Sequence, residues 1–382
     1  MSDHYRRKSP VTGATYDPKK ATHYSEIPTF MRTPLASDLS ELDIALVGVP
    51  FDLGVTNRPG ARHGPREIRN MSTITRTIHP VTRINPYELC RVADVGDVRF
   101  KNVYHLEEAI QDIESFFRHF HAVGVVPLSA GGDHSITYPI LKAIAADEPV
   151  GLVHIDAHTD TWDTLLGSNV QHGAPFRRSV EDGYLDPRRT VQIGIRGAMG
   201  NTEGWDYSLE KGMRVIFMDE VDRSGIDGVI AEARRVVGNG PTYISFDVDG
   251  IDPAYTPGTG TPEIGGLTTR EALSLLRGLR GLNFIGGDVV VTITHEWQRR
   301  FNSSDVAVIH RIDKPVEKKI ISELSEKFDD FRRAYHENGI PVAEFADFGA
   351  TRRTLRQFME GYEKLVGQIR DFMLPEPEDS II

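Results

Sequence analysis

Between about residue 43 and residue 291, short apolar runs alternate with longer stretches that mix apolar and charged residues. The runs are continuous, without a polar residue at every second position, and this pattern is typical of strands buried on both faces of a parallel sheet. Eight such runs predict eight strands, at 44–50, 91–96, 124–130, 151–155, 191–197, 213–219, the start of 241–253 and 283–291.

The stretches between these runs have the spacing of amphipathic helices. In 105–121, Leu106, Ile110, Ile113 and Phe117 recur every three or four residues and therefore share one helix face. Further helices are expected at about 136–146, 203–211, 225–238 and 268–280, with another starting near Pro65. Strands separated by helices predict an α/β fold with one doubly wound, mainly parallel eight-stranded sheet.

The two ends of the chain lack this alternation. Residues 1–40 are polar and rich in Pro, Ser and Thr, and we interpret them as an N-terminal arm on a surface or subunit contact. Residues 292–382 contain two charged amphipathic stretches, at 316–336 and 351–372, which predict an atypical, mainly helical C-terminal segment. The α/β domain is expected between them, at 41–291.

Composition narrows the class of partners. The 382 residues carry a formal net charge of -11, which argues against nucleic-acid binding. No apolar run approaches the roughly 20 residues that span a bilayer, and the opening MSDHYRRKSP lacks the apolar core of a secretory signal. With Cys90 as the single cysteine, no intrachain disulfide can form. We expect a cytoplasmic protein with no nucleic-acid and no membrane partner.

The strand at 151–155 runs directly into three side chains that often bind metals. Asp156, His158 and Asp160 alternate along GLVHIDAHTD, so in an extended chain they point to one side. Carboxylates crowded at close range cannot all stay ionised unless a cation lies among them. This stretch therefore predicts a metal site.

Two other strand ends carry the same residue types. The run at 241–253 reads PTYISFDVDGIDP and places Asp247 and Asp249 two residues apart. The strand at 124–130 ends in GGDHS, whose two glycines allow a sharp turn just before His134. Loops after strands hold the sites of α/β proteins, so we expect these residues to join the first cluster if the strands are neighbours.

The combined set contains four carboxylates, two imidazoles and no thiolate. Such a set favours a pair of divalent ions such as Mn²⁺, with Ni²⁺, Co²⁺ or Zn²⁺ also suited. Two ions about 3.5 Å apart can share a hydroxide and lower the pKa of water towards ~7. The sequence therefore predicts a dimetal hydrolase that acts through a metal-bridging hydroxide.

Each motif has a simpler interpretation when taken alone. Asp-Val-Asp at a strand end is usually a cap or turn, and GGDH is usually a tight turn. Asp133 could cap the helix after it, and His172 alone would be a surface histidine of the loop at 161–180. Three such motifs at strand ends of one α/β domain favour a shared site over independent accidents.

The motifs GGDHS, HIDAHTD and SFDVDGIDP, in this order and spacing, resemble the three signatures of the ureohydrolase family, and the match covers roughly residues 35–290. The resemblance implies a three-layer α/β/α sandwich with a dinuclear Mn²⁺ centre. It also implies hydrolysis of a small guanidino substrate to urea and an amine, by a homo-oligomer that is a trimer or a hexamer.

The resemblance also implies a role for each residue of the motifs. One metal ion would be bound by His134, Asp156, Asp160 and Asp247, and the other by His158, Asp156, Asp247 and Asp249. Asp156 and Asp247 would then bridge the two ions. His172, in QHGAPFRR, matches the loop histidine that transfers a proton to the leaving amine in this family.

Within the family, the segments HGAPFRR, RPGARHGPREIR and DPAYTPGTGTPEIGGLT are similar to the agmatinase and guanidinobutyrase branch. The loop that binds an α-amino acid in arginases has no recognisable counterpart. Agmatine, 4-guanidinobutyrate, 3-guanidinopropionate and small guanidines all stay open as substrates, because one methylene is worth only about 1–3 kcal/mol of discrimination.

The chain departs from the family at the end of the last predicted strand. The family has DVVEVSPP there, and its Glu orients the guanidinium; this chain has DVVVTITHE, with Val291 at that position. A valine cannot form the charge-assisted contact. Three explanations compete: Glu296 supplies the carboxylate, the chain is a metal-binding but weakly active or inactive subunit beside an active partner, or the replaced C-terminal segment has damaged activity.

Overall fold

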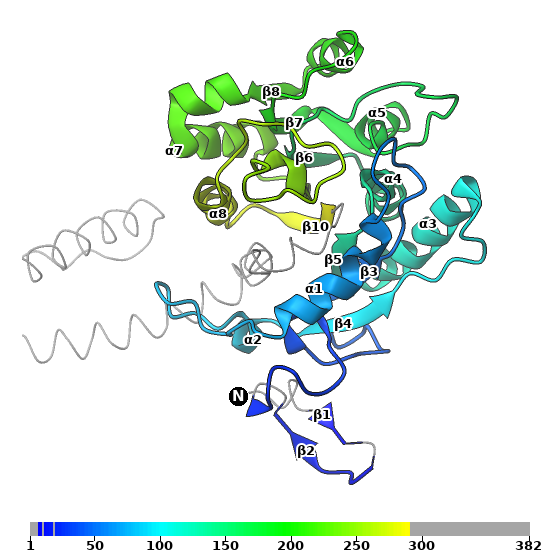
Figure 1. Cartoon of the computed structure of the whole chain (residues 1–382), viewed down its shortest axis with the longest axis vertical. Coiled ribbons are helices and arrows are strands. Elements are labelled where there is room, and N and C mark those ends of the chain that lie inside the picture. The colour runs from blue at the N-terminus through cyan, green and yellow to red at the C-terminus, as the bar shows by residue number, and fades with distance from the viewer. Residues whose placement is uncertain (1–6, 10, 18–19, 291–382) are drawn as a thin grey trace, which may run out of the picture. The chain divides into compact units, whose positions relative to one another are not determined.

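The computed structural model of the chain describes residues 7–9, 11–17 and 20–290. Its centre is an eight-stranded sheet in which all neighbouring strands pair in parallel, in the order β4-β3-β5-β10-β9-β6-β7-β8 (Figure 1). The strands are β3 (Ile44–Val49), β4 (Val92–Asp97), β5 (Val126–Gly131), β6 (Val150–Ile155), β7 (Leu185–Ile195), β8 (Arg214–Phe217), β9 (Thr242–Asp247) and β10 (Phe284–Val290). The predicted eight-stranded α/β sheet is confirmed.

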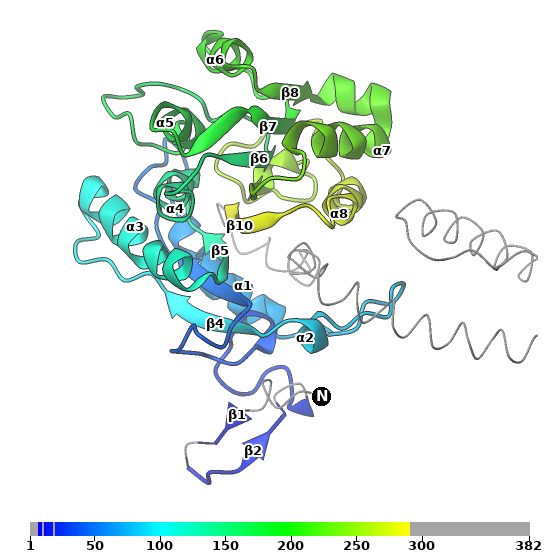
Figure 2. The same ribbon diagram turned by 180° about the vertical axis from the view of Figure 1, so that it is seen from behind.

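Helices cover both faces of the sheet, which gives three layers (Figures 1 and 2). One face carries α3 (Leu106–Val123), α4 (Thr137–Ile144) and α5 (Pro175–Glu181), and the other carries α1 (Gly64–Ser72), α7 (Met218–Val237) and α8 (Thr269–Gly278). The short α2 (Pro86–Leu89) precedes β4, and α6 (Glu203–Lys211) lies beside β8. The hydrophobic core is accordingly split into clusters on the two faces.

Local sequence explains where these elements begin and end. All six residues of β6 are buried, as the continuous apolar run predicts. Helix α3 ends at Gly124, whose left-handed conformation (φ 70°) lets its N–H reach the carbonyls of the last turn. Helix α8 begins with a capping box in which Thr268 and Glu271 each satisfy the other's backbone N–H.

Several predicted boundaries are wrong. The helix expected at 225–238 begins at Met218 and contains a break at Gly225 (φ 65°), which separates its first turns from the rest. The stretch 161–180, expected as a loop, contains α5. The strand expected at 191–197 is longer at its start, because β7 begins at Leu185.

The N-terminal arm is more ordered than its composition suggests. It contains a two-stranded antiparallel ribbon, β1 (Arg7–Lys8) and β2 (Thr15–Tyr16), and a short helix η3 (Phe30–Arg32). Phe30 and Met31 are only 3% and 5% exposed, because they pack into a cluster with residues of β3 and β4. The arm is therefore anchored in the core at this point.

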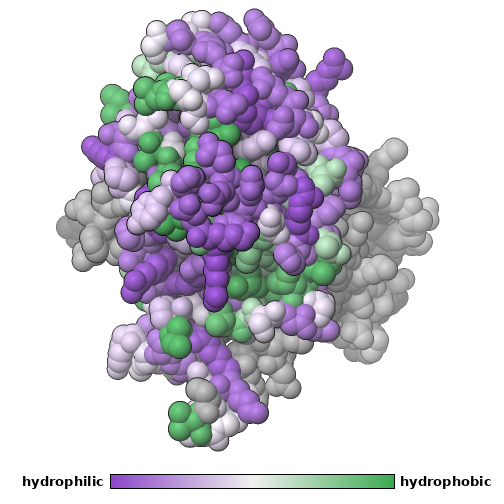
Figure 3. Space-filling model, turned by 90° about the vertical axis from the view of Figure 1, so that its right-hand side faces the viewer, coloured by the Kyte–Doolittle hydropathy of each residue, from purple (hydrophilic) through white to green (hydrophobic). Residues whose placement is uncertain are grey.

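The face of the molecule in Figure 3 is mostly hydrophilic, with hydrophobic residues in several smaller areas. Within the described part of the chain, no helix combines the length and the apolar character that a membrane span requires. The predicted C-terminal segment, including Val291 and Glu296, lies outside the described residues.

Candidate metal centre

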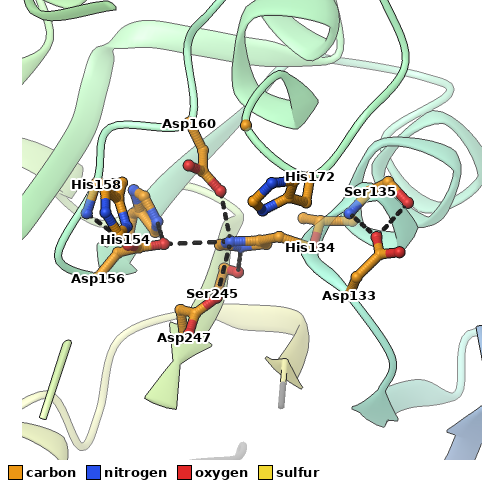
Figure 4. A network of polar contacts seen from close by, with 12 residues as sticks. Asp133, His134, Ser135, His154, Asp156, His158, Asp160, His172, Ser245 and Asp247 are labelled. Carbon is orange, nitrogen blue, oxygen red and sulfur yellow. Dashed lines mark hydrogen bonds and ion pairs between the residues drawn. The ribbon is translucent and has the colours of Figure 1, made fainter. Parts of the chain in front are cut away.

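The predicted ligands meet at the carboxyl ends of three strands (Figure 4). His134 opens the short helix η5 (His134–Ile136) after β5, Asp156 follows β6 directly, and Asp247 is the last residue of β9. The strands are not all neighbours, since β10 and β9 separate β5 from β6. The condition on which the sequence-based expectation depended, that β5 and β6 are neighbours, is therefore not met, yet the side chains still converge.

His134 is 2% exposed and is surrounded by carboxylates. Its Nδ1 lies 2.8 Å from Asp160 Oδ2, 3.2 Å from Asp156 Oδ2 and 3.5 Å from Asp247 Oδ2. Nevertheless, Nδ1 forms no hydrogen bond of acceptable geometry with any of them. A buried nitrogen that lies close to three carboxylates and forms no hydrogen bond with any of them is a candidate ligand for a cation shared by these groups.

The other ring nitrogen of His134 is fixed by a hydrogen-bonded chain. His134 Nε2 lies 2.8 Å from Ser245 Oγ, and that hydroxyl donates to Asp288 Oδ1 at 2.6 Å. Because the Ser245 proton goes to Asp288, Ser245 Oγ accepts the Nε2–H of His134. Nδ1 then carries the lone pair of the neutral ring, directed at the carboxylates.

Asp156 lies between the two histidines of the predicted ligand set. Its Oδ1 accepts a hydrogen bond from the backbone N–H of His158 at 2.6 Å and lies 3.4 Å from His158 Nδ1. Its Oδ2 accepts a hydrogen bond from His154 Nε2 at 2.8 Å and lies 3.2 Å from His134 Nδ1. One carboxylate therefore faces both halves of the cluster, as a bridging ligand must.

The second half of the cluster surrounds His158. Its Nδ1 lies 3.1 Å from Asp249 Oδ2, and its Nε2 lies 3.7 Å from Glu263 Oε1. The Asp249 carboxylate is held by Ala157 N at 3.0 Å and by Thr261 Oγ1 at 3.0 Å. These hydrogen bonds orient Asp249 towards the ring of His158.

Two further ligand candidates are held in specific conformations. Asp160 has a positive φ of 49°, a conformation that is uncommon for a residue other than glycine and that frequently marks functional sites. Asp247 Oδ1 accepts a hydrogen bond from Asp249 N at 2.9 Å, so this carboxylate is oriented by the turn it begins. All six predicted ligands are thus within one network.

The charges of this network oppose one another. Burial lowers the pKa of His134, but Asp156 and Asp160 raise it by more, so that it lies well above the usual range. Burial also lowers the pKa of His158, whereas Asp249 and Asp156 raise it to about 12. Burial, followed by Asp249 and then Asp156, raises the pKa of Asp247 well above the usual range. Without a cation, these raised pKa values mean that both histidines and the Asp247 carboxyl hold protons. A divalent cation among the groups would supply the positive charge in place of those protons.

His172 reaches the same pocket from the loop before α5. The pocket is lined by Val55, Asn57, Arg58, Gly132, Asp133, His134, His172, Asp247, Gly260 and Thr261. His172 Nε2 lies 2.8 Å from Thr56 Oγ1, and the His172 N–H donates to Gly54 O at 3.0 Å. Asp133 accepts from Gly54 N at 2.8 Å and caps η5, so its capping role is confirmed and it also holds the loop that positions His172.

Sequence reasoning missed the supporting residues. His154 was assigned only to an apolar run, although it continues the same alternation as Asp156 and His158. In the structure it forms a compact group with His134 and Asp156, while Asp156, His158 and Asp249 form another; the donor atoms in each group lie within 4.8 Å of one another. Ser245 and Asp288 offered no signal, because their contact depends on which strands are adjacent.

Comparison with known proteins adds to this geometry. Residues 42–295 match the profile of the Arginase family. The chain is 53% identical over 275 residues to guanidinopropionase of Pseudomonas aeruginosa, covering 72% of this chain and 86% of that protein. It is 49% identical over 263 residues to a mitochondrial agmatinase of Gallus gallus, covering 69% of this chain and 77% of the relative.

The fold of this chain is also similar to that of a solved structure. Proclavaminate amidino hydrolase from Streptomyces clavuligerus superposes with a TM-score of 0.71 at 36% sequence identity, covering 75% of this chain and 95% of that chain.

Proposed function

This chain belongs to the arginase family, and we propose that it hydrolyses a guanidino compound to urea and an amine at a dinuclear metal centre. The observation that carries the proposal is the environment of His134 Nδ1, which is buried without a hydrogen bond among three carboxylates. The resemblance seen in the motifs is confirmed by the family match, and the named relatives are hydrolases of guanidino compounds.

The residues of the cluster fit two divalent ions. We propose that His134, Asp156, Asp160 and Asp247 bind one ion, and that Asp156, Asp247, His158 and Asp249 bind the other, with Mn²⁺ as the expected metal and Ni²⁺ as an alternative. The position of Asp156 between both histidines supports its bridging role. Such a pair supplies Lewis acidity and lowers the pKa of water.

The remaining chemistry falls to His172. It lines the pocket together with His134 and Asp247 and is held from behind by Thr56 and Gly54. We propose that its imidazole gives a proton to the departing amine nitrogen, which converts a poor leaving group into a good one. Asp133 supports this role by fixing the loop at Gly54.

We propose that Arg58 faces the end of the substrate that lies away from its guanidinium group. It lines the pocket from an exposed loop, and its Nη1 donates to Thr259 O at 3.3 Å, while Asn57 Nδ2 donates to Gly260 O at 2.8 Å. A guanidinium at the pocket favours an anionic tail and disfavours a cationic one. Among agmatine and the guanidino acids, this charge supports an acid of the guanidinobutyrate type.

Val291 gives the alternative, a metal-binding chain with little activity. Val291, Glu296 and the stretch 292–300 lie outside the described residues. The distinction therefore rests on activity rather than on geometry. We also expect a homo-oligomer, a trimer or a hexamer, in the cytoplasm; some relatives carry mitochondrial names.

The test is urea release from a panel of 4-guanidinobutyrate, 3-guanidinopropionate, agmatine and guanidine, with Mn²⁺-loaded and Ni²⁺-loaded protein. A Val291→Glu variant is assayed in parallel, and metal content is measured on every sample. Turnover of a guanidino acid by the wild type is the expected result. Two bound metals without turnover, restored in Val291→Glu, would establish the inactive alternative, and no bound metal in the wild type would refute the dimetal centre.

A further inference from the structure

His154 lies at the metal centre but is not among the proposed ligands. It is fully buried on β6, and its Nε2 is 2.8 Å from Asp156 Oδ2. One of its ring nitrogens lies within 4.8 Å of potential metal-binding atoms of both His134 and Asp156 (Figure 4). Two roles are therefore compatible with its position: an additional metal ligand, or a group that acts through Asp156. The two roles require different protonation of Nε2, because a ligand nitrogen has no proton.

Gln192, on the neighbouring strand β7, distinguishes the two roles. Its Nε2 lies 2.6 Å from the carbonyl oxygen of Thr159 and 3.1 Å from His154 Nδ1. A carbonyl oxygen only accepts hydrogen bonds, so the atom facing Thr159 is the amide NH₂ and the orientation of the Gln192 side chain is fixed. The second N–H of this NH₂ group then donates a hydrogen bond to His154 Nδ1.

The tautomer of His154 follows from this contact. Because Nδ1 accepts a hydrogen bond from Gln192, the neutral ring carries its own proton on Nε2, and that proton points at Asp156 Oδ2. Nε2 is therefore a donor to a carboxylate and has no lone pair for a cation. The geometry excludes His154 from the ligand set while tying it to the carboxylate at the centre of that set.

We propose that His154 is a positioning residue that orients Asp156, and that it thereby sets the affinity of both metal sites. The inference rests on the proposed function, in which Asp156 bridges two ions. His158 N holds Oδ1 at 2.6 Å and His154 holds Oδ2 at 2.8 Å, so both oxygens are anchored. Each oxygen keeps a second lone pair, and each lies near a different histidine of the cluster, Oδ2 at 3.2 Å from His134 Nδ1 and Oδ1 at 3.4 Å from His158 Nδ1.

The test compares Mn²⁺ binding by the full-length chain and four variants, by calorimetric titration and by counting bound Mn²⁺. His154→Leu removes the donor, whereas His154→Gln places an amide N–H near the position of Nε2. Gln192→Leu leaves His154 in place but removes the hydrogen bond to Nδ1 that fixes its tautomer. Ser208→Ala is the matched control, because it removes another fully buried hydrogen-bonding group, one that contacts Thr161 Oγ1 at 3.0 Å.

We expect His154→Leu to weaken Mn²⁺ binding at both sites by about 10- to 100-fold. His154→Gln should stay within about threefold of the wild type, Gln192→Leu should be intermediate, and Ser208→Ala should be unchanged. Thermal unfolding and circular dichroism without metal show whether each variant folds. If His154→Leu does not fold, Gln192→Leu gives the answer alone, because an unchanged affinity in that variant contradicts the proposal.

Four other outcomes would overturn the inference. Loss of one ion from His154→Leu with unchanged affinity for the second would identify His154 as a ligand. Unchanged binding of two ions would show that Asp156 needs no such support, and the proposed function would stand without it. A wild type that binds no Mn²⁺ would overturn both. As an independent readout, ¹⁵N spectra of the metal-free protein should show Nδ1 of His154 without a proton, and a protonated Nδ1 contradicts the proposal.

Discussion

Ser245 donates a hydrogen bond of 2.6 Å to Asp288 across two adjacent strands, and the two residues are direct partners in the parallel register of β9 and β10. Asp288 is 1% exposed and accepts two more hydroxyl hydrogen bonds, from Tyr243 at 2.7 Å and from Thr137 at 2.8 Å. Strand β10 supplies no predicted ligand, yet through Ser245 it determines which nitrogen of His134 faces the carboxylates.

Ser245→Ala should therefore lower metal affinity on one side of the centre. Without the hydroxyl, the Nε2–H of His134 loses its acceptor and the ring can turn, so Mn²⁺ binding at the site around His134 should weaken about 10- to 100-fold. The control is Tyr243→Phe, which removes a hydroxyl from the same carboxylate. Both variants should lose about 1–2 kcal/mol of stability, but Tyr243→Phe should bind Mn²⁺ normally. Equal loss of Mn²⁺ binding in the two variants would contradict the role of Ser245 in orienting the His134 ring.

Asp156→Ala should remove both metal ions, because this carboxylate faces both histidines of the cluster. His158→Ala should remove only the ion on its own side. The measurement is the number of Mn²⁺ ions per chain, together with the rise in melting temperature on adding Mn²⁺, which follows the ratio of free metal to Kd. Retention of one full site in Asp156→Ala would refute its bridging role.

His172→Asn should slow turnover without loss of metal. General acid catalysis contributes about 10²- to 10⁴-fold, so kcat should fall within that range while the Mn²⁺ content stays at the wild-type value. Thr56→Val, which removes only the 2.8 Å contact to His172 Nε2, should show a smaller decrease. If His172→Asn loses metal as well, the residue belongs to the binding site rather than to proton transfer.

Cys90 should react slowly with iodoacetamide near neutral pH. Burial, with a further contribution from Asp43, raises the pKa of its thiol to about 11. A raised pKa means less thiolate at a given pH, so at pH 8 the rate should be about two orders of magnitude below that of an ordinary cysteine. The rate should then rise with pH until it levels off above about 11. The urea-unfolded chain is the control, and equal rates for folded and unfolded protein would contradict the shift.

The sequence predicted the strand ends well, because the features that place them are local. The alternation of Asp156, His158 and Asp160 needs nothing but the strand period of two, and the continuous burial of β6 follows from its apolar run. The structure brings all six proposed ligands into one network, and their roles as ligands stay a prediction.

The supporting residues could not be predicted for a physical reason. The pairing of Ser245 with Asp288 depends on strand order, and Gln192 reaches His154 only because β7 lies beside β6. Both contacts are properties of the assembled sheet. The burial of Phe30 was missed in the same way, since its partners belong to strands that follow it in the sequence.

The strand order also has a consequence for how the chain is made. Among the strands that the structure describes, β9 and β10 are the last two to be synthesised, yet they occupy the centre of the sheet, between β5 and β6. A nascent chain that has not yet reached residue 284 lacks the strand that joins β5 to β9, and its earlier strands remain two separate groups with open edges. Formation of the outer strands therefore does not complete the domain. The domain is complete only when β10 inserts between β5 and β9, and this insertion also brings His134 and Asp156 together.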